Sequence, residues 1–275
     1  MKSKILSWGL FVFILIAVLL YISPFYISFI SAFKPNGEIM RDPVALPESF
    51  FYLENFKFLL AKTDFPKAFL NSALLTIAAE LCILFIIPMA AYGIERTNKR
   101  VGSWIYTYFL AAMMVPFTVY MIPLFRQLKF IGLFGTFYGP ILIYVSGAIP
   151  FGVLLFTSFL KGVPREIEEA AKIDGCNSFK TFWQIVFPLL KPVTASMVIL
   201  NGLGIWNDFL MPMLVLPSSK PKTINVEIYQ FVDQFGARWD ILFAGVLCSI
   251  IPVFIVFVSL QKYFVKGISA GAAKG

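Results

Sequence analysis

A carboxylate stands inside the apolar stretch 68–94, where a membrane-spanning helix is expected. Counted from Ala68, Glu80 lies roughly 18 Å along that helix at about 1.5 Å per residue, close to the middle of the membrane. Ser72 and Thr76 precede it at intervals of four residues, so the three side chains form one polar stripe. An acid at this depth is costly and normally faces protein or water. Glu80 and Thr76 are therefore candidates for a polar pathway.

A second acid, Asp208, interrupts the apolar stretch 192–216. Asn201 lies seven residues earlier on the same helical face, and Trp206 lies close to that face. Carboxylates, amides and hydroxyls can bind a polar solute such as a sugar, and an aromatic ring can stack on it. A structural interpretation is also open, in which Glu80 makes a buried hydrogen bond and Asp208 stabilises the packing of its helix.

Several kinds of chemistry are excluded by the residues that the sequence lacks. The chain has no histidine, which removes zinc-protease motifs, Ser-His-Asp triads and most metal sites. It also lacks the G-x-x-x-x-G-K-[ST] pattern that binds nucleotide phosphates. We therefore expect no catalytic residue, no metal and no cofactor on this chain. If ATP drives its activity, ATP and magnesium bind to a separate chain.

The composition is that of a membrane protein. Hydrophobic residues make up 59% of the chain and charged residues only 14%, too apolar a mixture for a soluble fold. A spanning helix needs about 20 apolar residues. We predict a single all-α domain, residues 1–275, that forms a polytopic membrane protein with six transmembrane helices. The predicted spans are approximately residues 8–32, 68–94, 103–125, 134–160, 192–216 and 241–262.

The first apolar run is too long for a signal peptide and has no clear cleavage site, so we expect a retained helix. With both termini in the cytoplasm, 13 Lys and Arg residues lie in inner segments and 10 in outer ones. Arg96, Lys99 and Arg100 crowd one short turn, and short flanking loops carry the most weight. We expect a multi-pass protein of the bacterial inner (cytoplasmic) membrane, in contact with lipid, with both termini inside.

The formal charge of +8 then reflects topology, because no basic patch with interleaved aromatics indicates nucleic-acid binding.

The long polar segment between the apolar halves is residues 161–191. Pro164 suits the first turn of a helix, and the acids after it favour the positive end of the helix dipole. Gly175 suits the position just after the C-terminus. We predict a short helix on which Ala170 and Ala171 help to form one flat, approachable face.

The spacing of aromatic residues predicts a second helix directly after the first. Large apolar side chains repeat at helical intervals and would form one wide face: Phe179, Phe182, Trp183, Val186 and Phe187. Pro188 is expected to end this helix. The aromatic face would lie against the membrane boundary or the spanning helices, so that the first helix projects into the cytoplasm.

The sequence Glu169-Ala-Ala-Lys-Ile-Asp-Gly175 resembles the EAA loop of permease subunits from binding-protein-dependent ABC importers. The resemblance covers nearly the whole chain and points to the carbohydrate-importer branch, in particular to the second permease of maltose-type systems. Further similar segments are Asn71-Ser72, Ala91-Tyr92-Gly93 with Arg96, Pro123-Leu124-Phe125, Trp206-Asn207-Asp208-Phe209 and residues 261–275.

The resemblance implies a cytoplasmic coupling helix that docks on an ATPase subunit and transmits closure of the ATPase dimer to the permease. Its docking residues would be Glu169, Ala170, Ala171, Asp174 and Gly175, with Glu169 facing a basic group of the ATPase. The resemblance also implies a second permease subunit and an extracytoplasmic solute-binding protein as partners. The outer segment 217–239 corresponds in place to a loop that enters the binding protein, and the C-terminal tail to one that reaches the ATPase dimer.

Two alternatives stay open from the sequence. An EAA-type permease for a non-sugar solute would carry the same motif. A membrane-embedded transferase acting on lipid-linked sugars would need an acidic pair or a metal site, and Glu166, Glu168 and Glu169 are the only acidic cluster. Replacing Glu169 would abolish coupling to ATP in a permease, but a partner-independent transfer activity in a transferase.

Overall fold

The computed structural model describes residues 2–216, 222–233 and 236–272, with side chains for 8–216, 222–232 and 236–262. Every regular element in these residues is helical, so the predicted all-α membrane fold is confirmed for the described part of the chain. The contacts within the chain group its residues into two compact units. Unit 1 comprises Met1–Phe69 and Thr223–Pro252, and unit 2 comprises Leu70–Lys222 and Val253–Gly275.

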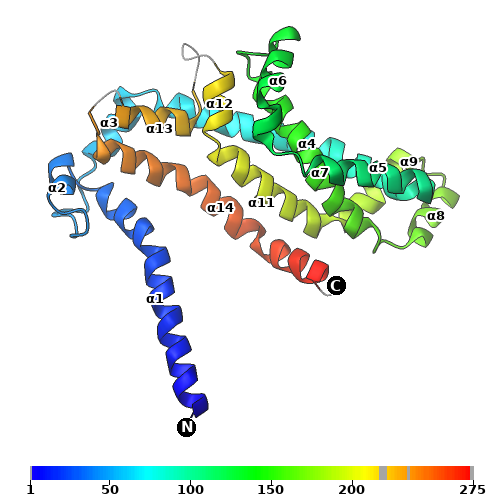
Figure 1. Ribbon diagram of the computed structural model, residues 1–275, viewed down its shortest axis with the longest axis horizontal. Helices are drawn as coiled ribbons and strands as arrows, with labels where there is room; N and C mark the ends of the chain where they lie inside the picture. Colours follow the sequence, from blue (N-terminus) through cyan, green and yellow to red (C-terminus); the bar gives the residue numbers. More distant parts are fainter. Residues whose placement is uncertain (1, 217–221, 234–235, 273–275) are drawn as a thin grey trace. The chain divides into compact units, whose positions relative to one another are not determined.

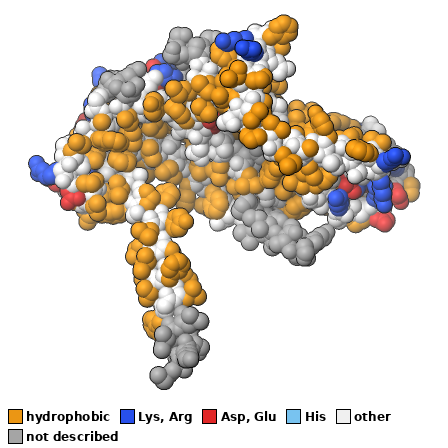
Figure 2. All heavy atoms as spheres, in the orientation of Figure 1, with side chains coloured by type: hydrophobic (Ala, Val, Ile, Leu, Met, Phe, Trp, Pro, Cys, Tyr) orange, Lys and Arg blue, Asp and Glu red, His pale blue; other side chains and the backbone are white. Residues whose placement is uncertain are grey.

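Unit 1 contains a long apolar helix and several short ones. Its elements are α1 (Lys2–Ser31), α2 (Asn36–Arg41), α3 (Glu54–Lys62), α13 (Ile224–Asp233) and the first part of α14 (Trp239–Ala272). From Trp8 onward α1 exposes apolar side chains along its length (Figure 2), as expected of a helix whose surroundings are lipid or protein. Asn55 ties α3 to the end of α1 through donor bonds to the carbonyls of Ala32 (2.9 Å) and Lys34 (2.8 Å).

Unit 2 holds the segments that the sequence singled out (Figure 1). Its helices are most of α4 (Phe65–Arg96), then α5 (Lys99–Ala112), α6 (Phe117–Phe130), α7 (Tyr138–Leu160), α8 (Arg165–Ile173), α9 (Ser178–Lys180), η1 (Thr181–Val186), α10 (Phe187–Leu189), α11 (Lys191–Asn207), α12 (Leu210–Val215) and the end of α14.

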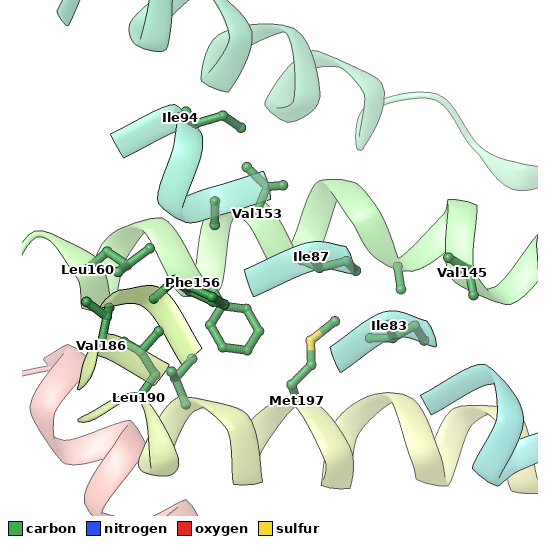
Figure 3. Close-up of a cluster of buried hydrophobic side chains, with 14 of the residues drawn as sticks. Ile83, Ile87, Ile94, Val145, Val153, Phe156, Leu160, Val186, Leu190 and Met197 are labelled. Atoms are coloured by element: carbon green, nitrogen blue, oxygen red, sulfur yellow. The ribbon is translucent and has the colours of Figure 1, made fainter. Parts of the chain in front are cut away.

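The core of unit 2 lies where α4, α7 and α11 meet (Figure 3). Ile87 of α4, Phe156 of α7 and Met197 of α11 are completely buried there. Gly152 of α7 allows the close approach, because a β-carbon at this position would lie 2.6 Å from Ile87 Cγ2 and 2.8 Å from Met197 Cε. This packing holds the membrane-spanning part of the unit together.

Four described helices are long and apolar enough to cross a membrane: Trp8–Ser31, Phe65–Arg96, Tyr138–Leu160 and Trp239–Lys262. The number rises to six if each of two bent pairs forms one span, Lys99–Ala112 with Phe117–Phe130 and Ser178–Leu189 with Lys191–Asn207. The described helices are therefore compatible with the six predicted spans, although two of those spans are not continuous helices.

The expected span 103–125 is divided by a bend of 98° between α5 and α6. α5 ends at Ala112 and α6 begins after Pro116. In a continuous helix the ring of Pro116 would clash with the carbonyl of Ala112, four residues earlier, and the residue before a proline avoids helical angles. The position of Pro116 therefore explains why the helix breaks between Ala112 and Phe117.

The expected span 192–216 is also interrupted, because α11 ends at Asn207 and α12 starts at Leu210. Asp208 adopts an extended conformation, with φ −72° and ψ 126°. Pro212 lacks the N–H that would bond the Asp208 carbonyl, and its ring would clash with that carbonyl in a regular helix. The acid that the sequence placed inside a helix thus lies at a helix break.

Candidate functional site

The predicted short helix is α8, and its ends are defined by local interactions. Pro164 is its N-cap, and Glu166 and Glu168 lie in its first turn, where acids favour the helix dipole. Gly175 has φ +84°, the left-handed conformation that ends many helices. The N–H of Cys176 donates to the Ala171 carbonyl (2.9 Å) and that of Gly175 to the Lys172 carbonyl (3.0 Å), which completes a Schellman motif.

α8 has an inner and an outer face. Glu168 and Ala171, three residues apart, are buried at 5% and 3% exposure. Glu169 and Ala170 are exposed, as are Asp174 and Gly175, and Ile173 is 87% exposed. The sequence predicted that Ala170 and Ala171 share one outward face. In the structure only Ala170 faces outward, because Ala171 packs inside the protein. Four of the five predicted docking residues lie on the outside of the chain.

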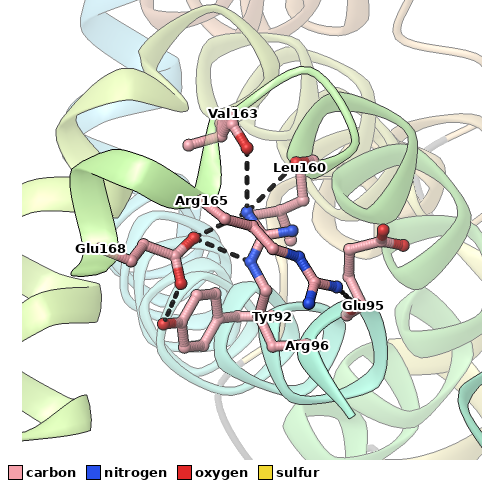
Figure 4. A network of polar contacts seen from close by, with 7 residues as sticks. All are labelled: Tyr92, Glu95, Arg96, Leu160, Val163, Arg165 and Glu168. Carbon is pink, nitrogen blue, oxygen red and sulfur yellow. Dashed lines mark hydrogen bonds and ion pairs between the residues drawn. The ribbon is translucent and has the colours of Figure 1, made fainter. Parts of the chain in front are cut away.

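The buried Glu168 is held by residues from α4 (Figure 4). Its Oε1 accepts from Nε of Arg96 at 2.7 Å and forms an ion pair with Nη2 of the same residue, also at 2.7 Å. Its Oε2 accepts from the Tyr92 hydroxyl at 2.7 Å. Nη2 of Arg96 also donates to the carbonyls of Val163 (3.1 Å) and Leu160 (3.4 Å) at the end of α7. One guanidinium group thus joins α4, α7 and α8.

The helix after α8 does not stop at Pro188, where the sequence predicted its end. It passes through the π-helix η1, in which the N–H of Phe187 donates to the Phe182 carbonyl, five residues back, and then continues through Pro188 into α10. A proline ring clashes with the carbonyl four residues before it in a regular α-helix, so the wider π turn admits Pro188.

Aromatic rings fix η1 against α4. The Tyr92 and Phe182 rings lie 5.1 Å apart, and Trp183 stacks on Phe85 with centroids 5.5 Å apart and planes 15° from parallel. Phe179, which the pattern placed on the same face, is 55% exposed. The predicted aromatic face therefore packs on a spanning helix at Phe182 and Trp183, and Phe179 extends from it.

A cavity of about 960 Å³ lies within unit 2, lined by the α5–α6 bend, α7, α11 and α12. Its wall is mostly apolar and aromatic. Side chains with rings or polar groups on it include Phe117, Tyr120, Tyr144, Phe151, Asn201 and Asp208. The structure thus brings two of the predicted pathway residues, Asn201 and Asp208, into one cavity wall.

Asp208 holds the helix break together. Its Oδ1 accepts from the backbone N–H groups of Leu210 (2.8 Å) and Met211 (3.3 Å), and thereby caps α12. Its Oδ2 accepts from the Tyr144 hydroxyl of α7 at 2.8 Å. The carboxylate therefore has a structural role and also lines the cavity.

We expect Asp208→Ala to destabilise the purified protein, because it removes a helix cap, worth about 1–2 kcal/mol, and the acceptor of the Tyr144 hydroxyl. Thermal unfolding in detergent, followed by tryptophan fluorescence, measures the change. The matched control is Asn207→Ala, an exposed neighbour whose Nδ2 donates to the Leu203 carbonyl of its own helix. Equal midpoints for the two variants would contradict the capping role.

The other three predicted pathway residues lie outside the described lining of this cavity. Glu80 is 8% exposed, and neither its carboxylate oxygens nor the Thr76 hydroxyl has a hydrogen-bond partner among the described residues. Glu80 faces Gly202 of α11, where a β-carbon would lie 3.7 Å from Oε1. Trp206 is buried at 8% exposure. The Glu80 carboxylate is therefore directed at α11 and not at the cavity.

Sequence reasoning missed the residues that hold α8. The sequence indicated Glu168 only as one of several acids, Tyr92 only as part of a similar segment, and Arg96 only as part of that segment and of a basic turn. Tyr92 and Arg96 are four residues apart, which places a hydroxyl and a guanidinium on one face at the polar end of an apolar helix. That spacing was the available signal.

Comparison with known proteins decides what kind of chain carries these features. Residues 83–270 match the family described as the binding-protein-dependent transport system inner membrane component. The chain belongs to this family. Its membership agrees with the predicted permease of a binding-protein-dependent importer and accounts for the apolar helices of the fold.

Relatives in this family are similar over nearly the whole chain. The probable starch degradation products transport system permease protein AmyC of Thermoanaerobacterium thermosulfurigenes is 36% identical over 261 residues, with 93% of each chain covered. The arabinooligosaccharides transport system permease protein AraQ of Bacillus subtilis is 32% identical, with 97% of this chain and 95% of the relative covered. The multiple sugar-binding transport system permease protein MsmG of Streptococcus mutans is 33% identical, with 99% of each covered.

A solved structure shares the fold. It is a chain of a bacterial ABC transporter involved in the import of the acidic polysaccharide alginate, with a TM-score of 0.83, 21% sequence identity, and coverage of 96% of this chain and 98% of that one.

Two predicted contacts lie wholly or partly outside the described residues. These are the C-terminal tail, whose side chains are not described beyond residue 262, and the segment 217–239, of which residues 217–221 and 234–235 are not described.

Proposed function

We propose that the chain is a permease subunit of an ATP-driven, binding-protein-dependent carbohydrate importer. The observation that carries this proposal is α8, a short helix held from inside by Glu168 that presents Glu169, Ala170 and Ile173 outward. An apolar side chain beside an acid at the exposed end of a transport subunit suits docking on a partner. The family match and the sugar-related names of the relatives support the transport role and the substrate class.

In the proposed mechanism this chain breaks no covalent bond. ATP and magnesium bind to a separate ATPase dimer, whose closure displaces α8, and the permease pair opens outward to receive sugar from a solute-binding protein. Hydrolysis returns the pair to its inward-open state. The partners are a second permease subunit, the ATPase dimer and the solute-binding protein. The fold shared with a chain of the alginate transporter supports this arrangement.

The proposal also assigns sides to the membrane. Charged side chains of both signs gather at the end of unit 2 that holds α8 (Figure 2), and we place this end and both termini in the cytoplasm. The cavity with Asn201, Asp208 and Tyr144 is the proposed portion of the sugar pathway. Its aromatic and polar lining suits a solute with hydroxyl groups.

The test is a pull-down of tagged protein from its native membrane in mild detergent, with bound chains identified and ATP hydrolysis measured. We expect the wild type to recover an ATPase and a second permease. Glu169→Ala is expected to weaken recovery of the ATPase, because it removes a charge from the exposed face of α8. The matched control is Glu48→Ala, an exposed acid in unit 1 that is far from α8 in sequence.

Recovery of the chain without any ATPase would refute the proposal. Undiminished recovery with Glu169→Ala would remove Glu169 from the docking surface but leave the rest of α8 in it. Uptake by the assembled importer, measured with labelled oligosaccharides and with amino acids, separates a carbohydrate permease from one for a non-sugar solute.

A further inference from the structure

The side-chain hydrogen bonds of α8 converge on the last turns of α4. Both oxygens of Glu168 are occupied by α4 residues, Arg96 and Tyr92. Arg165, at the start of α8, donates from Nη2 to the backbone carbonyl of Glu95 at 3.4 Å, again in α4. Within the described residues, the hydrogen bonds recorded for the side chains of α8 all join it to this helix.

The same guanidinium extends the connection to α7. Arg96 donates to the carbonyls of Leu160 and Val163, where α7 ends and the chain turns toward α8. The Leu160 carbonyl also accepts from the Val163 N–H at 3.1 Å. Residues 143–151 of α7, farther along the same helix, line the cavity. A continuous chain of contacts therefore runs from α8 through Arg96 to a helix of the cavity wall.

These contacts are stiff. The side chains of Arg96 and Glu168 are only 14% and 7% exposed, so water competes little for their hydrogen bonds. A planar guanidinium that donates in several fixed directions defines the position of its partners more closely than a lysine would. The Tyr92 ring also packs 5.1 Å from Phe182 of η1, which fixes the hydroxyl that binds Glu168. Closely packed interiors transmit displacements instead of absorbing them.

We infer that the cluster of Tyr92, Arg96 and Glu168 is the mechanical link that makes α8, the end of α4 and the end of α7 move together. Its residues are positioning residues for coupling, distinct from the outward residues of α8 that dock on a partner. The inference rests on the proposed function, since it assigns the route by which displacement of α8 reaches the cavity. Without the link, α8 would still dock and would stay joined to α7 through residues 161–164, but its side chains would no longer hold the ends of α4 and α7 to its displacement.

The experiment reads the cavity wall directly. Cys82, Cys176 and Cys248 are replaced by serine, and Ser146, an exposed residue of α7 in the cavity wall, is replaced by cysteine as a reporter. The complex is purified with its ATPase into lipid nanodiscs. The rate at which a polar maleimide labels the reporter is measured with and without MgATP and vanadate, and ATP hydrolysis is measured in parallel.

The main variant is Arg96→Met/Glu168→Met, which removes both charges and so leaves no unpaired charge buried. We expect it to keep the ATPase bound and hydrolysing, while the nucleotide-dependent change in labelling rate is lost. The matched control is Glu166→Met, an exposed acid two residues away on the same helix, which should keep the full change. A merely structural role would lower the yield of complex but leave the labelling change intact.

A double variant that retains both the ATPase and the full labelling change would overturn the inference. If this variant does not assemble, Arg96→Lys is measured instead. Lysine keeps the charge but cannot reach Glu168 and the α7 carbonyls together. An undiminished labelling change in Arg96→Lys would also overturn the inference. Absence of an ATPase from the parent complex would refute the proposed function and the inference with it. If the parent complex shows the labelling change and only the cluster variants lose it, the result supports the link.

Discussion

Arg96→Ala is expected to lower the free energy of unfolding by about 3–5 kcal/mol, the usual cost of removing one partner from a buried ion pair. The substitution leaves the Glu168 carboxylate buried without its cation and removes the side-chain donor to the carbonyls of Leu160 and Val163. Because the penalty comes from an uncompensated charge, neutralising that charge should relieve it. Thermal unfolding of the purified protein in detergent measures the loss.

Two comparisons make this prediction specific. Arg100→Ala, at an exposed position near the start of α5, should change the midpoint little. Arg96→Met/Glu168→Met should unfold at a higher temperature than Arg96→Ala, because a buried pair replaced by apolar side chains is often close to neutral. A double variant no more stable than Arg96→Ala would show that charge burial is not the source of the loss.

Gly152→Ala is expected to destabilise the protein by about 1–3 kcal/mol, the range for overpacking a close-packed core. The added methyl carbon would lie 2.6 Å from Ile87 and 2.8 Å from Met197, so α4 and α11 must both move away from α7. Yield and unfolding temperature of the purified protein are the measurements.

The control for this prediction lies on the same helix. A β-carbon at Gly147 would meet no atom within 4 Å, so Gly147→Ala should be neutral or slightly stabilising through helix propensity. If both alanine variants behaved alike, the close approach at Gly152 would not limit the packing of unit 2.

The sequence predicted the helical elements well where a single local rule decides them. Gly175 ends α8 because a left-handed residue is needed there, and glycine adopts that conformation freely. Pro116 and Pro212 account for where the two predicted spans break, because a proline ring clashes with the carbonyl four residues before it. The sizes of the breaks were not predictable, because the bend between α5 and α6 depends on what each half packs against.

The candidate site was predicted less completely, for two reasons. Whether Glu168 or its neighbour Glu169 faces inward depends on how α8 rolls against η1, and both fit the acidic start of a helix. The π turn at Thr181–Val186 shifts the residues after it relative to a regular helix, which an α-helical pattern does not reveal. Both features arise from tertiary packing.

On the sugar pathway proposed above, the helix break at Asp208 also changes the energetics of solute entry. A hollow of about 960 Å³ has room for on the order of thirty water molecules. The Asp208 carboxylate and the Asn201 amide on its wall favour hydration over a filling of lipid tails. A sugar that enters such a hollow does not pass into a purely apolar environment. It exchanges its own hydration shell and the water in the hollow for contacts with aromatic and polar side chains of the wall. The barrier to its passage is then set by how closely the wall matches the hydrogen bonds of that water.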